Sequence, residues 1–205
     1  MRLVKKNNIS TMILSIYAGL MIGIGGYVYL SVDSKIIGAF IFSFGLLTIV
    51  TQKFYLYTGK VGFVKNRNDI LNIPIIIVGN IVGTYIMSLV YRITHTDFTQ
   101  INDIWLNKIN KSTYEVLILS IMCGILMYLA IDNYNKNRNI IFIIMPVMVF
   151  ILSGFEHSIA NMFYYFSSDY RNIESAIYLL TNIFGNGVGA IIFNYFKERL
   201  LINGN

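Results

Sequence analysis

Glu156 and His157 are the adjacent pair of residues best suited to chemistry in this sequence, and they lie inside a hydrophobic region. The stretch "SGFEHSIANM" (153–162) that contains them follows "IIFIIMPVMVFIL" and precedes "FYYF". A carboxylate beside an imidazole can carry out general acid–base catalysis or transfer a proton to a passing solute. An ionisable group in hydrocarbon costs several kcal/mol unless protein buries it or a wet cavity reaches it. Three interpretations follow: a catalytic site, a position on a transport pathway, or a structural histidine.

Little else in the sequence supports an enzyme or a metal site. It has no His-Glu-x-x-His motif, no serine–histidine–acid constellation and no paired aspartates. Two histidines and one cysteine, Cys123, are too few for a metal cluster, and a single cysteine cannot form a disulfide within the chain. We therefore expect no enzymatic activity, no catalytic residue, no metal and no cofactor, and we assign Cys123 to packing.

Composition indicates a membrane protein. Hydrophobic residues make up 56% of the sequence and charged residues 13%, whereas soluble domains carry about 25% charged residues. Six apolar segments approach the ~20 residues that cross a bilayer as a helix. They are 9–30, 36–52, 70–91, 115–131, 140–166 and 175–196. They nearly use up the 205 residues, so we expect one all-α domain, 1–205, with six transmembrane helices.

The basic residues indicate orientation rather than a nucleic-acid partner. Net charge is +6, but these residues lie at the ends of the apolar segments and are not clustered with exposed aromatic residues. If the N-terminus is inside, nine Lys and Arg residues are inside and five are outside, as the positive-inside rule requires. The inside set is Arg2, Lys5, Lys6, Lys65, Arg67, Lys136, Arg138, Lys197 and Arg199, and the outside set is Lys35, Arg92, Lys108, Lys111 and Arg171.

This count predicts a multi-pass protein of the cell (inner or plasma) membrane with both termini in the cytoplasm. The start "MRLVKKNN" leads into an apolar run that is too long for a signal peptide and has no small-residue cleavage site, so we expect a retained first helix.

In the connection 92–114, apolar residues recur every three or four positions, at Phe98, Ile101, Trp105 and Ile109. That spacing is typical of a helix lying in the membrane interface, and a polar loop with a few packing residues is the alternative.

Two short motifs recur at nearly the same distance along the chain. "GNIVG" (79–83) returns as "GNGVG" (185–189), and "AGLMIG" (18–23) is echoed by "CGILMY" (123–128). The offsets of 106 and 105 residues indicate two halves of three spans each. Because three is odd, the second half must be inverted, with a substrate site near the midplane at interrupted helices. Glycine spacings that only serve helix packing are the alternative explanation.

The interruptions are expected in the second span of each half. "QKFYLYTGKVGFV" (52–64) places Lys53, Thr58, Gly59 and Lys60 where an unbroken span would be apolar. In the second half, 140–152 supplies only ~20 Å of helix before Ser153 and Gly154 weaken it. Irregular backbone at membrane depth is tolerated where protein buries it or water reaches it. We therefore expect helices 2 and 5 to be broken and the two breaks to face each other, with His157 lining a pathway.

These motifs resemble the formate/nitrite transporter family, which also includes hydrosulfide channels. "SGFEHSIANMF" is similar to the fifth-helix signature of that family, and "AGLMIGIGG", "GLLTIV…LYTG", "GNIVG" and "GNGVGA" extend the similarity over nearly the whole chain. The resemblance implies an aquaporin-like fold of six helices in two inverted repeats. It also implies a homopentamer in which each protomer holds its own pore.

The resemblance also implies roles for individual residues. His157 matches the central pore histidine, and Thr58 matches the threonine that hydrogen-bonds it. The other matched positions on the substrate pathway are Leu46 and Leu56 at a cytoplasmic constriction, Tyr57 beside them, Phe42 and Phe150 at an external constriction, Lys108 in the external vestibule and Asn186 near the pore. Structural roles at the breaks are expected for Glu156, Asn161, Gly59 and Asn80. For Glu156 we expect its carboxylate to accept backbone N–H bonds.

The chain departs from the family pattern around the first break. Tyr55 stands where an acidic residue is usual, Tyr57 where phenylalanine is usual, and Lys60 where "LFTGN" ends in asparagine; Gly124 replaces an asparagine of helix 4. Lys53 and Lys60 either attract anions to a vestibule or extend their charges to the interface.

The sequence thus predicts a channel for small monovalent weak-acid anions, namely formate, nitrite or hydrosulfide, with protons and the lipid bilayer as further partners. His157 either transfers a proton to the anion or supplies positive potential. A channel for small neutral solutes with aquaporin-like architecture is the alternative, although no Asn-Pro-Ala motif occurs. A structural or sensor membrane protein would not need ionisable groups at two facing breaks.

Overall fold

The computed structural model describes residues 8–203, and within that range the chain consists of helices joined by short loops. The helices are α1 (Asn8–Leu30), α2 (Lys35–Thr51), α3 (Tyr57–Lys60), the 3₁₀ helix η1 (Val61–Phe63), α4 (Arg67–Thr94), α5 (Thr99–Ile109), α6 (Thr113–Asn137), α7 (Ile141–Leu152), α8 (Ser158–Ser167) and α9 (Ile173–Asn203). The all-α class predicted from the sequence is therefore confirmed for the described part of the chain. Arg2, Lys5 and Lys6, which entered the charge count, lie outside the described residues.

Four of the described helices are long and apolar enough to cross a membrane: α1, α4, α6 and α9. Two further apolar helices, α2 and α7, are shorter. Large apolar side chains face outward on several helices, with Ile93 83% exposed, Leu200 72% and Phe184 64%. A surface of this kind suits lipid or a second protein chain rather than water.

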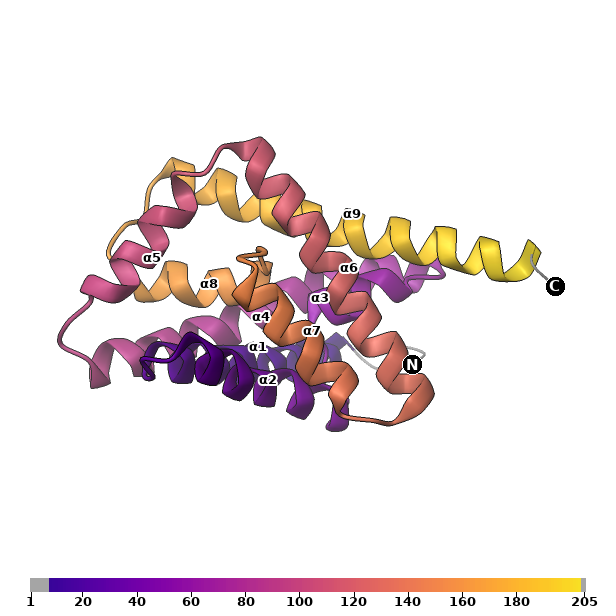
Figure 1. Ribbon diagram of the computed structural model, residues 1–205, viewed down its shortest axis with the longest axis horizontal. Coiled ribbons are helices and arrows are strands. Elements are labelled where there is room, and N and C mark those ends of the chain that lie inside the picture. The colour runs from indigo at the N-terminus through magenta and orange to yellow at the C-terminus, as the bar shows by residue number, and fades with distance from the viewer. Residues whose placement is uncertain (1–7, 204–205) are drawn as a thin grey trace.

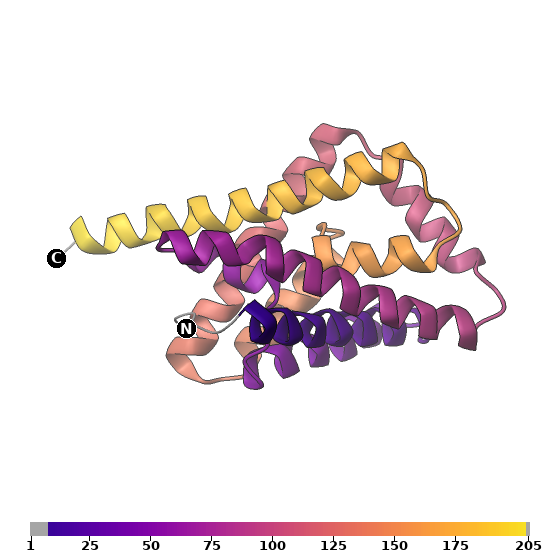
Figure 2. The ribbon, with the colours of Figure 1, turned by 180° about the vertical axis from the view of Figure 1, so that it is seen from behind.

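The helices are arranged as two packed pairs with shorter helices between them. In Figures 1 and 2, α1 lies along α4, whereas α6 crosses α9 obliquely and packs closely on it; α2 packs on α1 and on α7. Glycine allows each pair its close approach. A Cβ atom built on Gly83 would lie 2.2 Å from the carbonyl oxygen of Ile16, and one on Gly189 would lie 2.1 Å from that of Ile121. Any larger residue would push the paired helices apart.

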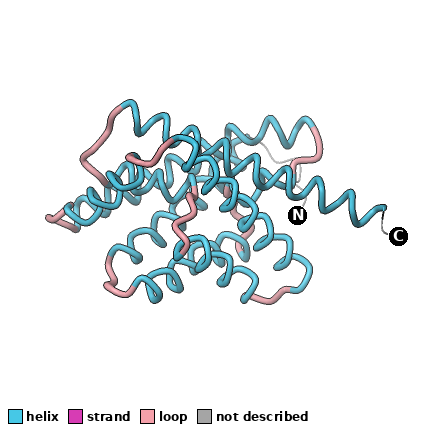
Figure 3. The backbone as a smooth tube through the Cα atoms, turned by 45° about the horizontal axis from the view of Figure 1, so that its top comes forward, coloured by secondary structure: helices cyan, strands magenta, loops and turns pink. Residues whose placement is uncertain are grey.

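Two loops run through the interior of the molecule, one between α2 and α3 and one between α7 and α8 (Figure 3). Each loop leaves its helix in the same way. Lys53 (φ 60°) and Gly154 (φ 70°) take left-handed backbone two residues after the last helical residue. The backbone N–H of the following residue then donates a hydrogen bond to the carbonyl oxygen five residues earlier. The pairs are Phe54 to Ile49 and Phe155 to Phe150, each with an N···O distance of 2.9 Å. The chain then becomes extended and starts a new short helix.

The connection between α4 and α6 contains a helix, α5, as the apolar spacing at Phe98, Ile101, Trp105 and Ile109 predicts. Ile101 and Trp105 are fully buried, and the indole Nε1 of Trp105 donates to Ser175 Oγ at 3.3 Å. The helical interpretation of this segment is confirmed. Its packing against α8 and α9 holds the connection over one end of the bundle.

Candidate functional site

His157 lies where α8 begins and joins the two interior loops. Its Nδ1 atom accepts a hydrogen bond from the backbone N–H of Ala160 at 3.1 Å, so the side chain caps the N-terminus of α8. Its Nε2 atom lies 3.0 Å from Thr58 Oγ1 on α3. Because Nδ1 accepts from an N–H, it carries no proton, and the neutral ring must carry its proton on Nε2. His157 therefore donates to the hydroxyl of Thr58.

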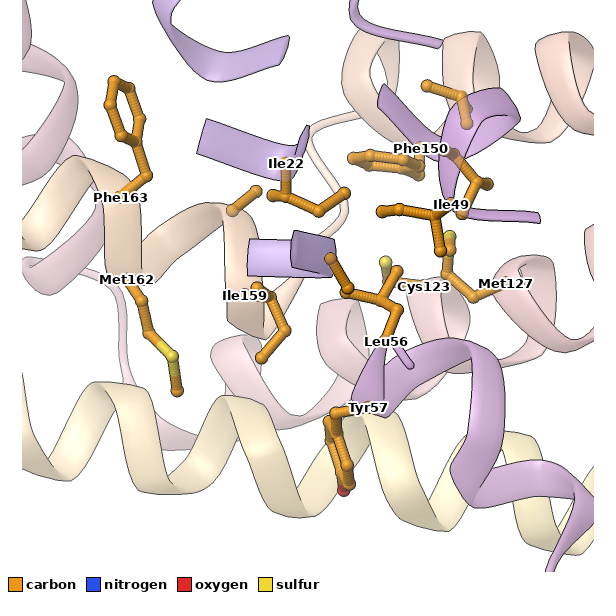
Figure 4. Close-up of a cluster of buried hydrophobic side chains, with 14 of the residues drawn as sticks. Ile22, Ile49, Leu56, Tyr57, Cys123, Met127, Phe150, Ile159, Met162 and Phe163 are labelled. Atoms are coloured by element: carbon orange, nitrogen blue, oxygen red, sulfur yellow. The ribbon is translucent and has the colours of Figure 1, made fainter. Parts of the chain in front are cut away.

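Apolar side chains enclose this polar contact. The ring of Phe150 stacks on the imidazole of His157 with centroids 5.4 Å apart, and Phe42 meets Phe150 edge-on at 6.0 Å. Leu46 and Leu56 are each 1% exposed. Figure 4 shows Leu56 and Phe150 in one buried cluster with Ile22 and Ile49. An ion passing this point would lose its hydration to apolar walls, which is costly for a charged species.

Cavities lie next to this apolar zone. The first, the histidine cavity, has a volume of about 230 Å³ and is lined by His157, Phe42, Phe150, Lys108 and Asn161, among others. The second, the small chamber, holds about 20 Å³ beside Leu56 and Gly59. The third, the lysine vestibule, has about 640 Å³ between the ends of α3 and η1, the start of α4 and the ends of α6 and α9.

Two buried asparagines fix the interior loops. Asn80 of α4 donates from Nδ2 to the carbonyls of Ser15 and Tyr55, and its Oδ1 accepts from the N–H of Tyr57; all three distances are 2.8 Å. The loop before α3 is thereby tied to both α1 and α4. An amide side chain suits this position because it can donate twice and accept once.

Asn186 of α9 makes the same three bonds to the other loop. Its Nδ2 donates to the carbonyls of Ser120 and Glu156, and its Oδ1 accepts from the N–H of Ser158, again at 2.8 Å each. The N–H groups of Tyr55 and Glu156 complete the correspondence by donating to the carbonyls of Leu14 and Leu119. These backbone N–H and carbonyl groups of both interior loops are therefore hydrogen-bonded although they are buried, as an apolar environment requires.

Glu156 is fully buried and is held by side chains rather than by backbone. The ammonium groups of Lys108 and Lys111 each lie 2.6 Å from one of its oxygens, and Asn161 Nδ2 donates to it at 2.9 Å. The expectation that its carboxylate accepts backbone N–H bonds is corrected by these contacts; only its main-chain carbonyl is bound by Asn186. Two cations facing one anion leave this cluster with a formal excess of one positive charge.

Outside the spans, Asp169 ties the connection before α9 to α4 and α5. Asn102 donates to its carboxylate at 3.0 Å and Arg92 at 2.9 Å. These bonds, with that of Asn102 contributing most, hold the pKa of Asp169 below its usual value. The carboxylate is therefore ionised at neutral pH and links the connection before α9 to α4 and α5.

The remaining predicted positions fall into different surroundings. Tyr57 donates its hydroxyl to the carbonyl of Ile183 at 2.8 Å, so its ring is directed toward α9 (Figure 4). Cys123 is fully buried in the apolar cluster. Sequence reasoning missed Lys111 as a partner of Glu156, and it missed Tyr29 and Tyr164, which line the histidine cavity. The spacing of three between Lys108 and Lys111 was the only available signal.

Comparison with known proteins gives consistent relatives. The formate channel FocB of Escherichia coli (strain K12) is 25% identical over 189 residues, covering 78% of this chain and 67% of that protein. The formate channel FocA of the same strain is 26% identical over 190 residues, covering 77% and 66%. The chain thus spans about two thirds of the length of these relatives.

Solved structures show that the fold is shared. A structure described as a pentameric formate channel with formate bound matches with a TM-score of 0.84 at 24% identity, covering 95% of this chain and 97% of that one. A second, described as an FNT family ion channel, matches with a TM-score of 0.80 at 21% identity and covers 95% and 89%. The sequence pattern of the formate/nitrite transporter family matches residues 1–197. This chain therefore belongs to the formate/nitrite transporter family of membrane transport proteins.

Proposed function

We propose that the chain is a channel for small monovalent weak-acid anions, which pass His157 between two apolar constrictions. Relatives named formate channels and a fold shared with a formate-bound channel support this class of substrate. The observation that carries the proposal is the buried histidine itself. It is 2% exposed, it touches a cavity on one side, and its Nε2 proton is directed to a hydroxyl on the opposite interior loop.

The proposed protomer has six spans in two inverted repeats. In this arrangement α2 with α3 and α7 with α8 form the two interrupted spans, and α1, α4, α6 and α9 form the unbroken ones. The matching bonds of Asn80 and Asn186 support it, because they occur 106 residues apart and hold corresponding loops. Five protomers would assemble with their apolar outer faces against one another and against lipid.

The proposed route has three stages. An anion enters the histidine cavity, where the lysine pair around Glu156 provides excess positive charge. It then reaches His157 behind the rings of Phe42 and Phe150. After the leucines at 46 and 56 it leaves through the small chamber and the lysine vestibule. We assign the vestibule to the cytoplasmic side from the excess of Lys and Arg there.

Proton transfer explains how an anion could cross the apolar zone. Burying an ionised carboxylate in such surroundings is very costly, whereas the neutral acid has no net charge to desolvate. The Nε2–H of His157 is a donor that a bound anion can reach in place of Thr58 Oγ1. That N–H holds the anion by a hydrogen bond, and the proton that makes the neutral acid comes from solvent in the histidine cavity. The ring keeps its own proton, because a neutral imidazole that lost it would become a strongly basic imidazolate.

Flux into liposomes tests the proposal. Purified protein is reconstituted, and uptake of formate, nitrite and hydrosulfide is compared with uptake of chloride, which is a strong-acid anion. The weak-acid anions should enter quickly and chloride far more slowly, and cross-linking should show five chains. Fast flux of glycerol without flux of any of the three anions would instead support a channel for neutral solutes.

A further inference from the structure

Lys60 occupies an unusual position at the inner end of the proposed route. It is the last residue of the short helix α3, two residues after Thr58, and only 7% of it is exposed. It lines both the small chamber and the lysine vestibule, so its side chain stands where the two meet. Most lysines keep their ammonium groups in water, and a lysine buried to this extent needs a reason.

The other charged groups of the lysine vestibule largely compensate one another. Asp132 pairs with Lys136 at 2.8 Å and with Lys197 at 2.5 Å, and Glu198 pairs with Lys65 at 3.2 Å. Asp69 accepts from the backbone N–H of Lys65 at 3.1 Å. The lining set of four lysines and three acids leaves a formal excess of one positive charge. Lys60 is the most buried lysine of this set.

The small chamber makes the charge of Lys60 effective. Its other lining residues are glycine or apolar: Ile49, Val50, Phe54, Leu56, Gly59, Phe63 and Ile131. An ammonium group in such surroundings attracts an anion more strongly than one in water, because the local dielectric constant is lower. The volume of about 20 Å³ is close to that of a single water position. Only a small ion can enter the small chamber beside Lys60.

The position of the ammonium group is fixed. Its Nζ lies 4.4 Å from the centroid of the Tyr55 ring, and the backbone of Tyr55 is held by Asn80 and by the carbonyl of Leu14. Tyr55 therefore sets where the charge stands. An ammonium group has three N–H donors, so it can contact an anion while keeping other partners.

We propose that Lys60 forms a second anion-binding site, at the junction of the lysine vestibule and the small chamber, on the other side of Leu56 from His157. Its ligand class is a small monovalent anion such as formate or nitrite. This inference rests on the proposed function and adds an asymmetry to it. Entry from the vestibule side depends on Lys60, whereas entry from the histidine cavity depends on Lys108 and Lys111.

The test measures half-saturation separately from each side. Formate uptake is recorded in right-side-out and inverted vesicles, and the vestibule side is identified with Asn137→Cys, an exposed position beside the vestibule, using a membrane-impermeant thiol reagent. The native Cys123 is buried. The variant is Lys60→Asn, because asparagine is the residue that the family pattern has at this position. Lys60→Arg preserves the charge.

For Lys60→Asn, the half-saturating formate concentration on the vestibule side should rise roughly tenfold, as expected for loss of one charge-assisted hydrogen bond. On the histidine-cavity side it should stay within about twofold of wild type, and Lys60→Arg should restore the vestibule-side value. Lys53→Asn is the matched control: Lys53 is exposed in the same loop, and asparagine tolerates its left-handed backbone. This control should behave like wild type on both sides.

An unchanged vestibule-side value in folded Lys60→Asn would overturn the inference while leaving the proposed channel function intact. An equal rise on both sides would also overturn it, because it would show a general effect on the pore. Absence of any weak-acid flux in wild-type vesicles would be a different failure, that of the proposed function. Thermal unfolding of each purified variant checks that the substitutions leave the fold unchanged.

Discussion

Replacing His157 by phenylalanine separates the chemistry of the imidazole from its packing. A phenyl ring has nearly the same shape and can keep the stacked contact with Phe150, whose centroid lies 5.4 Å from the imidazole. The change removes the bond to Thr58 Oγ1 and the cap on the N–H of Ala160. Loss of an N-cap costs about 0.5–2 kcal/mol, a small part of the roughly 5–15 kcal/mol that holds a typical domain folded. We therefore expect His157→Phe to fold.

We expect His157→Phe to change formate flux much more than it changes the free energy of unfolding. Removing a positioned hydrogen-bond donor from a buried site costs about 10²- to 10³-fold, so formate flux in His157→Phe liposomes should fall about a hundredfold or more. The assay is stopped-flow uptake with a pH-sensitive dye enclosed in the liposomes. His95 provides the control, because it is the other of the two histidines and stacks on Tyr91 at 4.2 Å. His95→Phe should keep flux within about twofold of wild type.

Wild-type formate flux in a well-folded His157→Phe protein would refute the reasoning. It would show that the anion does not need the hydrogen bond that the Nε2–H of this ring can donate. A loss of flux equal in His157→Phe and His95→Phe would also count against the proposal, because it would indicate a general effect of removing an imidazole.

Three further results are expected. Thr58→Val removes one hydrogen bond to the imidazole and leaves the ring, so flux should fall about tenfold, less than in His157→Phe. Asn80→Ala and Asn186→Ala each remove three hydrogen bonds to buried backbone groups and leave two loop groups unpaired, so each should lose about 3 kcal/mol or more of unfolding free energy, seen as a lower thermal midpoint in detergent. Wild-type flux should rise as external pH falls from about 8 to 6, because each anion that crosses as the neutral acid takes up one proton, and membrane potential should have little effect because the neutral acid carries no charge.

Matched controls accompany these results. Thr94→Val removes a threonine hydroxyl at an exposed end of α4 and should leave flux unchanged. Asn137→Ala removes an exposed amide at the end of α6 and should leave the thermal midpoint unchanged. Chloride currents equal to formate currents, steep in voltage and insensitive to pH, would contradict proton transfer and identify a plain anion channel.

The sequence predicts the elements better than their contacts. Apolar runs and the spacing at Phe98, Ile101 and Trp105 identify helices, because burial of one face imposes the helical period. The paired "GN" motifs mark the two asparagines, and the glycines beside them explain close helix packing. What each asparagine binds depends on extended loops that approach from another part of the chain. Periodicity carries no information about such contacts.

The environment of Glu156 shows the same limit. Its neighbours in sequence are an aromatic residue and a histidine, whereas its charge partners, Lys108 and Lys111, are 48 and 45 residues away. Lys111 follows the end of α5, where no helical spacing relates it to the carboxylate. Only the fold brings the two lysines to one buried acid. The contacts that set the tautomer of His157, with Ala160 and with Thr58, likewise come from the fold and not from the sequence pattern.

The cap that His157 places on α8 has a consequence for energy conservation. A histidine passes bare protons along a chain of donors by accepting on one ring nitrogen and releasing from the other. Here Nδ1 is committed to the N–H of Ala160, so only Nε2 can exchange. Nε2 already carries a proton, so the neutral ring has no free nitrogen that could accept another proton and pass it on. In the proposed mechanism a proton therefore crosses only as part of a neutral acid. A pore built in this way can release an acid without conducting free protons. It would therefore not dissipate the proton gradient in which a membrane stores energy.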